Sequence, residues 1–342
     1  MPATNGRSPV MADVARLAGV SHQTVSRVLN GHPNVKAETR TRVEMAIGEL
    51  GYRRNSSARA LVTRRTSVIG VVAFDPTLYG PASTLGGIER AARASGYFLS
   101  VVTLQTVTRQ AVREAMDYLA QQSVEGYIVV APLRTVVDGL VDLPYGRPVV
   151  AVEGGEAPDL PVVCVDQPGG AYLATRHLLD LGHRTVHHIT GPSDWLEAEG
   201  RVAGWRLALE EAGAPVHEPL SGDWRPRAGY ELGRRLADGN EATAIFVAND
   251  QMALGALRAL GEAGVRVPGD VSVVGFDDVP EAEFFAPPLT TVAQDFNEVG
   301  QRSIALLVSL LEASGGPGAQ PIRDVVPARL ITRQSTANPP AS

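Results

Sequence analysis

Polar side chains follow two apolar runs in the second half of the chain. Asn249 comes directly after the run 244–248, and Asp277 comes directly after the run 271–276. In a parallel sheet flanked by helices, the carboxyl ends of the strands meet at one edge, and small ligands bind at that edge. We therefore expect an amide and a carboxylate to point into one cleft, where they would hydrogen-bond a small molecule. The alternative is structural, because Asn249 and Asp250 are also good caps for the helix that follows.

Hydrogen-bonding side chains also gather near the amino terminus, between residues 22 and 27. Arg27 has a guanidinium that can pair with guanine through two hydrogen bonds, and Gln23 has an amide that can do the same with adenine. The two residues are four positions apart, which places them on one face of a helix. His22 and Ser26 share this outward side. The segment therefore predicts a surface that reads base edges in the major groove of DNA.

Three short helices are predicted to carry this surface. Gly19 breaks the first, Ser21 is suited to cap the second, and the third spans about 37–50. A helix, a tight glycine turn and a second helix with an exposed polar face are typical of a helix-turn-helix, and the alternative is a plain three-helix bundle. The apolar positions that we expect in its core are Met11, Val14, Ala15, Ala18, Val25, Val28, Leu29, Val43, Ala46, Ile47 and Leu50.

The charge of the chain is divided unevenly. The whole sequence has 31 Lys and Arg against 37 Asp and Glu, a net charge of −6. Residues 1–65 hold 11 of the basic and 4 of the acidic residues, which is +7, so the remainder has 20 against 33, which is −13. A small basic module on an acidic body predicts a polyanion partner for the module alone, and a solvated basic face is the simpler alternative. The arginines that we expect at phosphates are Arg40, Arg42, Arg53 and Arg54.

From residue 67 onward, apolar runs alternate with amphipathic stretches. Such runs indicate buried parallel strands, and the stretches between them indicate covering helices. The series starts again near residue 162, which predicts two doubly wound domains with a cleft between them. Strands are expected at 67–74, 97–103, 127–130, 149–152, 162–165, 186–190, near Val216, 244–248, 271–276 and 325–332. Helices are expected at 85–95, 109–122, 168–181, 195–212, 227–238, 250–263 and from 295 to about 311, with a loop at 315–318.

The predicted fold class is α/β, with an N-terminal all-α helix-turn-helix domain and two doubly wound, Rossmann-like subdomains. We expect the helix-turn-helix domain at 1–52 and a hinge helix or linker at 53–65. The first core subdomain is expected at 66–165 together with 295–324. The second is expected at 166–294 together with 325–335, followed by a disordered tail at 336–342.

The chain has none of the common catalytic motifs that we sought. Walker A, Gly-x-Ser-x-Gly, Gly-x-Gly-x-x-Gly and His-Glu-x-x-His sequences are absent. His187 and His188 are adjacent, so on a strand they face opposite sides, and we expect no metal and no cofactor. Cys164 is the only cysteine, which excludes an internal disulfide. No apolar run reaches 18 residues and no signal core precedes residue 10, so we expect a cytoplasmic protein with no membrane partner.

The amino-terminal residues resemble the lac repressor (LacI/GalR) family. The resemblance is carried by Asp13-Val14-Ala15, Ala18-Gly19-Val20-Ser21 and Thr24-Val25-Ser26-Arg27-Val28-Leu29-Asn30. It implies that His22, Gln23 and Arg27 occupy the family's base-reading positions. Val10 departs from the pattern, because the family usually has a Ser or Thr cap there, and its absence should cost the first helix about 1 kcal/mol.

Residues 55–62 resemble the hinge of the same family. The resemblance implies a helix that is marginal alone and forms when a partner hinge and DNA hold it, with Leu61 wedged into the minor groove. A flexible linker is the alternative, and Arg54 stands where the family commonly has Pro. The implied DNA-contacting residues are His22, Gln23, Ser26, Arg27, Asn30, Arg40, Asn55, Ala58 and Leu61.

The body of the chain resembles the ligand-binding core of this family and of periplasmic sugar-binding proteins. The segments that carry this include Ala203-Gly204-Trp205, Gly222-Asp223-Trp224, 249–256 and 287–296, and the whole resemblance covers about residues 10–333. It implies a sugar site, since a pyranose suits charged hydrogen-bonding groups beside an aromatic ring. The implied effector-binding residues are Leu78, Pro81, Glu153, Glu197, Arg201, Trp224, Asn249, Asp277, Gln294 and Phe296.

Some of these positions have other interpretations. Arg201 could simply pair with Glu197 one helical turn away. Glu153 and Glu197 depart from the galactoside-binding pattern, which has Asp and Ser there, and Thr84 replaces an apolar residue. A galactoside is therefore expected, and another glycoside or a disaccharide stays open.

Three functions follow from these observations: a sugar-responsive repressor, a free sugar-binding protein and a sugar-processing enzyme. The basic module favours the repressor. The family implies a homodimer on a near-palindromic operator, and a sugar effector that changes the angle between the core subdomains and melts the hinges. Release by an inducer is implied, and a corepressor, for example of purine type, stays open. The terminal leucine heptads of tetrameric members do not follow Arg333, which predicts a dimer.

Overall fold

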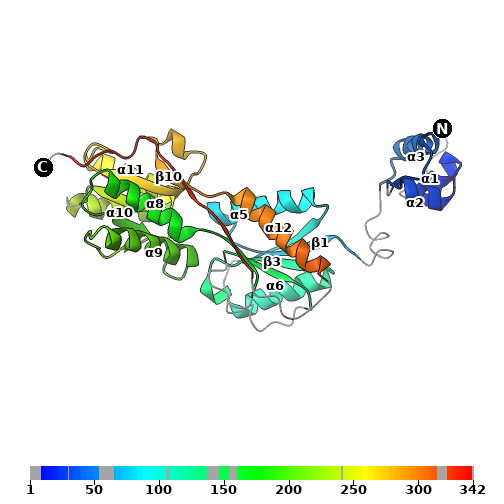
Figure 1. The fold of residues 1–342 in the computed structure, drawn as a ribbon, viewed down its shortest axis with the longest axis horizontal. Coiled ribbons are helices and arrows are strands. Elements are labelled where there is room, and N and C mark those ends of the chain that lie inside the picture. The colour runs from blue at the N-terminus through cyan, green and yellow to red at the C-terminus, as the bar shows by residue number, and fades with distance from the viewer. Residues whose placement is uncertain are drawn as a thin grey trace. The chain divides into compact units, whose positions relative to one another are not determined.

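The computed structural model describes residues 9–29, 31–53, 65–104, 108–136, 146–153, 160–239, 242–313 and 322–340. The chain divides into two compact units, Met1–Thr66 and Ser67–Ser342. The first is a small helical domain, and the second consists of two α/β lobes (Figure 1). Across the described ranges, no helix combines the length and the apolar character that a membrane span requires.

The first unit contains helices α1 (Met11–Ala18), α2 (His22–Leu29) and α3 (Ala37–Leu50). Their shared core is apolar, and Val14 and Val25 are fully buried in it. Gly19 ends α1 in the left-handed conformation, at φ 65°, which residues with a side chain rarely adopt. Ser21 begins α2, because its Oγ accepts a hydrogen bond from Thr24 N at 3.1 Å. The predicted helix-turn-helix arrangement is confirmed.

The first lobe of the core is a six-stranded parallel sheet in the order β11-β5-β4-β3-β1-β2. Its residues alternate between two faces. Val71 packs in the apolar cluster that includes residues of α5 and α12, and Val72 packs in the cluster that includes residues of α6. The elements are β1 (Val68–Phe74), α5 (Tyr79–Ala94), β2 (Phe98–Leu104), α6 (Arg109–Gln121), β3 (Gly126–Val130), β4 (Val149–Val152), β5 (Val162–Val165), α12 (Phe296–Glu312) and β11 (Arg323–Val326).

The second lobe repeats this plan in the order β12-β10-β9-β8-β6-β7, with β12 antiparallel to β10. Helices α8 and α9 contribute to the cluster on one face, and α10 and α11 to the cluster on the other. The elements are α8 (Gln167–Asp180), β6 (His187–Thr190), α9 (Leu196–Glu211), β7 (Leu220–Ser221), α10 (Pro226–Gly239), β8 (Ala244–Val247), α11 (Asp250–Glu262), β9 (Ser272–Asp277), a 3-10 turn (Ala282–Phe284), β10 (Thr290–Ala293) and β12 (Arg329–Ile331).

The described chain passes between the lobes three times: after β5, after β10, and between β11 and β12. Gln167 and Gln294 lie on the first two of these crossings. Helix α12 follows a strand of the second lobe but packs against α5 of the first lobe (Figure 1). A side chain on Gly87 would collide with the Phe296 carbonyl, and one on Gly300 would collide with the Gly87 backbone. The two helices therefore pack backbone to backbone, which fixes where α12 begins.

Two strand predictions need correction. The strand expected near Val216 lies at β7, a few residues later. The single strand expected at 325–332 is two strands, β11 in the first sheet and β12 in the second. Pro327 stands between them, and because proline has no N–H it interrupts the ladder where the chain changes lobes.

The end of the chain also differs from the prediction of a disordered tail from residue 336. Ala337 N donates a hydrogen bond to Ser272 Oγ at 3.0 Å, and Ala337 O lies 3.0 Å from His183 Nε2. Thr336 Oγ1 lies 3.0 Å from His177 Nε2. The polar composition predicts disorder, but these groups form hydrogen bonds with polar side chains of the second lobe. The chain is therefore held against that lobe at these residues.

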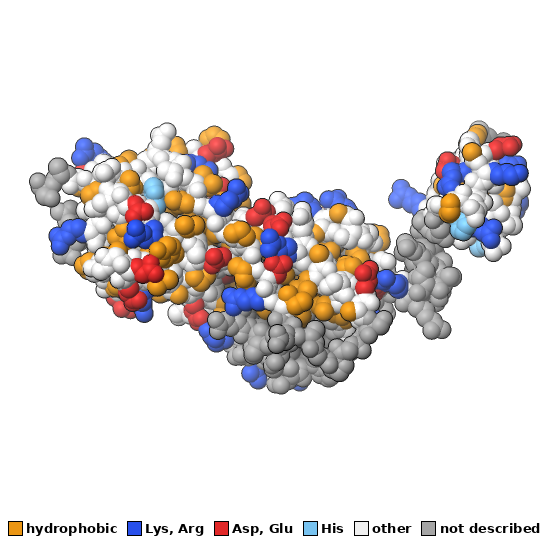
Figure 2. Space-filling view, in the orientation of Figure 1, with side chains coloured by type: hydrophobic (Ala, Val, Ile, Leu, Met, Phe, Trp, Pro, Cys, Tyr) orange, Lys and Arg blue, Asp and Glu red, His pale blue; other side chains and the backbone are white. Residues whose placement is uncertain are grey.

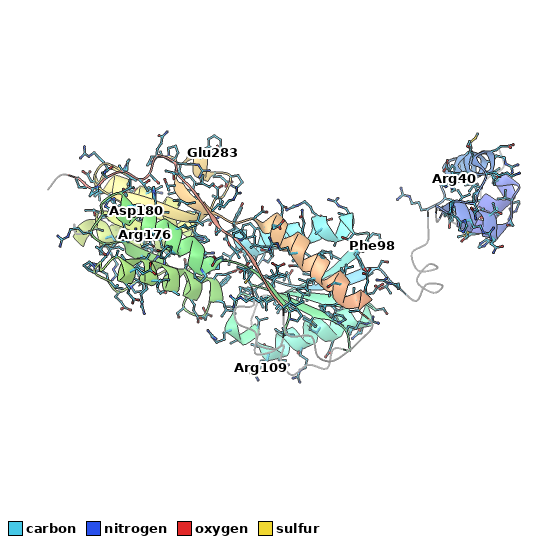
Figure 3. All side chains as sticks on the ribbon, in the orientation of Figure 1. Arg40, Phe98, Arg109, Arg176, Asp180 and Glu283 are labelled. Atoms are coloured by element: carbon cyan, nitrogen blue, oxygen red, sulfur yellow. The ribbon has the colours of Figure 1, made fainter. Side chains whose placement is uncertain are left out.

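Acidic and basic side chains are interspersed on the visible face of the core lobes (Figure 2). Several pair one helical turn apart, such as Arg176 Nη2 and Asp180 Oδ1 on α8, which are 2.7 Å apart (Figure 3). Some large apolar side chains are nevertheless exposed. Phe98, on the edge strand β2, is 66% exposed, and Val101 and Leu254 are also exposed.

Candidate ligand-binding cavity and nucleic-acid interface

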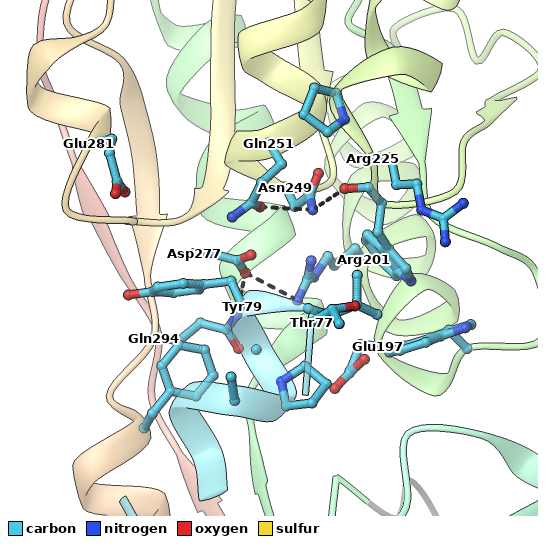
Figure 4. A pocket seen from close by; sticks show the side chains of 18 residues that line it. Thr77, Tyr79, Glu197, Arg201, Arg225, Asn249, Gln251, Asp277, Glu281 and Gln294 are labelled. Carbon is cyan, nitrogen blue, oxygen red and sulfur yellow. Dashed lines mark hydrogen bonds and ion pairs between the residues drawn. The ribbon is translucent and has the colours of Figure 1, made fainter. Parts of the chain in front are cut away.

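A cavity of about 460 Å³ lies between the core lobes, at the carboxyl ends of their strands. Figure 4 shows Tyr79 and Gln294 on one side of it and Asn249 on the other, with Asp277 and Arg201 between them. Its volume and its mixture of aromatic and charged groups are typical of a site for a small molecule. The lining consists of Thr77, Leu78, Tyr79, Gly80, Pro81, Ala82, Trp195, Glu197, Arg201, Trp224, Arg225, Pro226, Asn249, Gln251, Asp277, Glu281, Gln294 and Phe296.

Four polar side chains form a closed ring beside this cavity. Arg201 Nε donates to Gln167 Oε1 at 2.9 Å, and Gln167 Nε2 donates to Gln294 Oε1 at 2.9 Å. Gln294 Nε2 donates to Asp277 Oδ1 at 2.6 Å, and Arg201 Nη2 lies 3.7 Å from the same oxygen. Both glutamines lie on segments that cross between the lobes. The ring therefore links Asp277 and Arg201 to both crossings.

Asn249 combines the two roles that the sequence allowed. Its Oδ1 accepts a hydrogen bond from Met252 N at 2.9 Å and so caps α11, while the residue also lines the cavity. Its Nδ2 donates to Trp224 O at 3.0 Å, and this hydrogen bond holds the loop that carries Trp224 in place. Asp250 is fully buried and accepts from Val279 N at 2.9 Å, so its role is structural.

Burial changes the protonation of three carboxyl groups here. Burial raises the pKa of Asp277 to about 6, against the opposing effect of the Arg201 guanidinium. Burial, together with the nearby Glu153 charge, raises the pKa of Glu197 to about 8. Burial raises the pKa of Glu153 to about 7, although a hydrogen bond from Val165 N at 3.1 Å lowers it. Because desolvation disfavours the charged form, Glu197 can present a protonated carboxyl group at neutral pH.

Backbone conformation is unusual at the same site. Positive φ angles occur at Glu153 (59°), Trp224 (71°), Asp277 (110°) and Asp278 (51°). Residues with a side chain adopt this region at an energetic cost, which the surrounding structure must offset. Such residues cluster at ligand sites, and here they fix the directions of two lining side chains, Trp224 and Asp277.

Trp224 forms one wall of the cavity. A side chain on Gly191 would collide with the indole, so that glycine provides the space in which the ring lies. The ring is 6% exposed, and Arg201 Cζ lies 5.4 Å from its centroid and 4.0 Å from the centroid of Phe276. The aromatic rings therefore help to hold the guanidinium in the ring of hydrogen bonds.

The structure brings nine of the ten predicted effector residues to this cavity: Leu78, Pro81, Glu197, Arg201, Trp224, Asn249, Asp277, Gln294 and Phe296. Glu153 is placed differently. It is buried and lines a neighbouring cavity of about 350 Å³, which Glu197 also lines. The alternative pairing of Arg201 with Glu197 does not occur, because Arg201 donates to Gln167 and to the Ala248 carbonyl instead.

Reasoning from the sequence missed Thr77, Tyr79, Trp195, Arg225, Gln251 and Glu281. Tyr79 lies between the predicted residues Leu78 and Pro81, and Arg225 follows the predicted Trp224. These neighbours could have indicated both residues. Trp195 had no such neighbour. It follows β6 and forms an isolated bridge with Leu133 of the first lobe. Its position just beyond the carboxyl end of a strand is the one signal that could have found it.

The predicted DNA-reading side chains lie on α2 as expected. His22, Gln23 and Arg27 are exposed, and Ser26 is half-buried. Arg27 O accepts a hydrogen bond from His32 N at 2.9 Å, but its side chain makes no hydrogen bond or ion pair within the described ranges, so its guanidinium is available to a base. Arg40 Nη2 donates to His32 O at 3.0 Å. The predicted contacts Asn30, Asn55, Ala58 and Leu61 lie outside the described residues.

No group of three or more His, Cys, Asp or Glu side chains suited to a metal ion is found within the described segments. His187 and His188 have separate surroundings, as expected for adjacent residues of a strand. The ring of His187 stacks on His217 at 4.4 Å, and the buried ring of His188 stacks on Phe246 at 4.5 Å.

Each of the two units contains a match to a known family. Residues 10–55 match the family described as bacterial regulatory proteins, lacI family, and residues 175–336 match the periplasmic binding protein-like domain. The lactose operon repressor of Escherichia coli is 34% identical over 96% of this chain and 90% of its own length. The transcriptional regulator CelR of Thermobifida fusca is 36% identical over 96% and 98%. The repressor PurR of Haemophilus influenzae is 33% identical over 94% and 97%.

Solved structures give the same result. The lac repressor dimer bound to operator and the anti-inducer ONPF is similar with a TM-score of 0.81 and 32% identity, over 97% of this chain and all of the other. The CelR–cellobiose complex is similar with a TM-score of 0.71 and 33% identity, over 96% and 99%. The protein therefore belongs to the LacI family: it is a transcriptional regulator with a DNA-binding helix-turn-helix and a ligand-binding regulatory domain, and it is not an enzyme.

Proposed function

We propose that this regulator binds operator DNA as a homodimer and is released from it by a small, uncharged sugar, for which a galactoside or another glycoside is the first candidate. The observation that carries the proposal is the cavity between the lobes, where hydrogen-bonding groups and aromatic rings face one space. The hydroxyl groups of a pyranose can bond to the hydrogen-bonding groups, and its apolar C–H face can stack on the aromatic rings.

Charge in the cavity favours an uncharged ligand over a phosphorylated one. The lining carboxylates are Glu197, Asp277 and Glu281, and the lining guanidinium groups are Arg201 and Arg225. With Glu197 protonated, the two guanidinium groups only balance Asp277 and Glu281, so the cavity has no excess positive charge for a phosphate, and the chain has no glycine-rich phosphate loop. One similar structure, the CelR–cellobiose complex, was solved with a sugar.

Release requires a ligand that binds one arrangement of the lobes better than the other. The ring of Arg201, Gln167, Gln294 and Asp277 provides such a connection, since two of its members lie on the crossing segments. A sugar that hydrogen-bonds Asp277 would change the ring and with it the angle between the lobes. The changed angle would separate the paired hinges, and operator affinity would fall.

Operator reading is assigned to α2. Arg27 and Gln23 are exposed on one face of this helix, where they can reach guanine and adenine in the major groove. Arg42 and Arg53 are also exposed and suit phosphate contacts. The homodimer is proposed because a similar solved structure is a lac repressor dimer bound to operator.

The proposal is tested by selecting an operator from a random duplex pool and measuring affinity by fluorescence anisotropy, with and without a panel of mono- and disaccharides. We expect binding that weakens with salt and with at least one sugar. Arg27→Ala should lose about 1–3 kcal/mol of discrimination between the operator and its base-substituted forms, while sugar binding is unchanged. Tighter operator binding with a purine than without it would instead establish the corepressor alternative. Unchanged operator preference in the Arg27 variant would refute the assignment of α2.

A further inference from the structure

Four aromatic rings line the cavity as two edge-to-face pairs, and each lobe contributes one pair. Trp195 and Trp224 of the second lobe have ring centroids 5.5 Å apart at 69°. Tyr79 and Phe296 of the first lobe have centroids 5.8 Å apart at 78°. Rings that meet edge to face present their flat sides in different directions. A single pyranose ring can therefore stack on Trp224 or on Trp195, but not on both at once.

Trp195 is held in place from several sides. Its ring packs against Phe74 with centroids 6.1 Å apart at 77°. Its backbone bridges to Leu133, and the next residue, Leu196, donates its N–H to Pro132 O at 2.9 Å. The side chain still lines the cavity although it is only 8% exposed. A rigid indole that faces a ligand cavity is a surface for a ring, and the second lobe has two of them.

A second cavity adjoins the main one near Trp195. Glu197, two residues further along, lines both the main cavity and the neighbouring cavity of about 350 Å³. That second cavity has a polar lining, which includes Gln167 and the ion pair of Arg134 Nη2 and Glu199 Oε2 at 2.6 Å. The Glu197 side chain makes no hydrogen bond or ion pair with another residue in the described part of the chain, so its carboxyl group is available to a ligand.

We propose that the effector has two linked sugar rings and that Trp195 and Glu197 form the subsite for the second ring. This rests on the proposed sugar-binding function and adds the size of the ligand to it. The first ring lies on Trp224 and is hydrogen-bonded by Asp277 and Asn249. The second ring lies on Trp195, with a hydroxyl hydrogen-bonded to Glu197. A monosaccharide would fill only the first subsite.

The test uses isothermal titration calorimetry on the full chain, with a panel of disaccharides and the monosaccharides that compose them. We expect a disaccharide to bind at least about tenfold more tightly than either half. Trp195→Ala should weaken that disaccharide by about tenfold and change monosaccharide affinity by less than about twofold. Trp195→Phe should retain part of the difference, because it keeps a flat ring. Phe284→Ala, at an aromatic residue that is 80% exposed and does not line the cavity, is the control and should change neither affinity.

Trp195 also packs in the core, so a second variant keeps the test decisive if Trp195→Ala does not fold. Glu197→Ala removes a partly exposed side chain at the boundary of the two cavities and should weaken only the disaccharide. Equal losses for mono- and disaccharides in these variants, or a monosaccharide that binds wild type as tightly as the disaccharide, would overturn the second subsite and leave the sugar-responsive regulator standing. Failure of every sugar to bind would overturn both.

Discussion

The two core lobes contribute different chemistry to the same cavity. The second lobe provides the buried polar groups, namely Arg201, Asn249 and Asp277, while the first provides mainly apolar and aromatic groups such as Tyr79 and Phe296. Polar groups that are already fixed in a ring can bind a ligand before the lobes close. Apolar groups on the opposite lobe add contacts as the lobes approach. We therefore assign affinity mainly to the second lobe, and the effect of the ligand on the lobe angle mainly to the first.

The largest expected effect is that of Arg201→Ala. The guanidinium is 5% exposed, and it is the cation nearest to the Asp277 carboxylate, at 3.7 Å. Its removal leaves the buried Asp277 carboxylate with the hydrogen bond from Gln294 Nε2 but without its cation, and breaking such a pair costs about 3–5 kcal/mol of the free energy of unfolding. We expect urea denaturation to show that loss, and calorimetry to show no sugar binding. Arg201→Lys, the matched control, keeps the charge and should lose less stability. Wild-type stability in the alanine variant would show that the second lobe does not depend on this ring.

Asp277→Asn should affect binding much more than folding. Asparagine has nearly the same shape and tolerates the positive φ of this position, 110°. It cannot accept hydrogen bonds as a charged group, and such bonds contribute about 1.5–3 kcal/mol, so sugar affinity should fall about 10- to 100-fold. Operator affinity without sugar should remain at the wild-type value in anisotropy measurements. If sugar affinity were retained, the polar ring would not be the binding element of the second lobe.

Phe296→Ala tests the first lobe. We expect a loss of sugar affinity of about tenfold at most, because one partly exposed apolar contact is removed. The ratio of the operator affinity without sugar to the operator affinity with saturating sugar should fall towards one. We expect this because the Phe296 contact forms as the lobes close. Trp224→Phe on the second lobe is the comparison and should weaken binding while preserving that ratio. The reverse ranking of the two variants would contradict the division of roles between the lobes.

The smallest effect concerns pH. Burial raises the pKa values of Asp277, Glu153 and Glu197 to about 6, 7 and 8, whereas unfolded carboxyl groups titrate near pH 4. The folded core therefore keeps protons that the unfolded chain has released. This contribution to stability is complete below about pH 4 and is lost as the pH rises through about 6–8. We expect the Tm of the sugar-free protein to fall between pH 5 and pH 8, and Glu197→Gln to reduce that fall. Parallel Tm curves for the two proteins would count against a protonated Glu197 carboxyl group in the folded protein.

Several features of the site could be predicted from the sequence because they depend on local pattern. The apolar runs before Asn249 and Asp277 stop at a polar residue, and the parallel arrangement then brings such strand ends together. The exposed face of α2 follows in the same way from the spacing of Val25 and Val28. These inferences need only period, length and the rule that ligands bind at the carboxyl edge.

Other features depend on contacts between distant segments and could not be predicted. Trp195 lies just beyond a strand end, but its bridge to Leu133 in the other lobe has no signal in the sequence. Glu153 lines the neighbouring cavity rather than the main one, and only side-chain packing decides between the two. Ala337, in the predicted tail, is held by hydrogen bonds with Ser272 and His183, which lie far away in the sequence.

The most direct test is the affinity of the full chain for its selected operator, measured by anisotropy across a titration of the sugar that binds most tightly. Operator affinity should fall as the sugar saturates Asp277 and its neighbours, with the same midpoint as calorimetric binding, and the Asp277→Asn titration should shift to higher sugar concentration. Operator affinity that stays constant while calorimetry shows the cavity filled would contradict the coupling between the cavity and the DNA-binding helices.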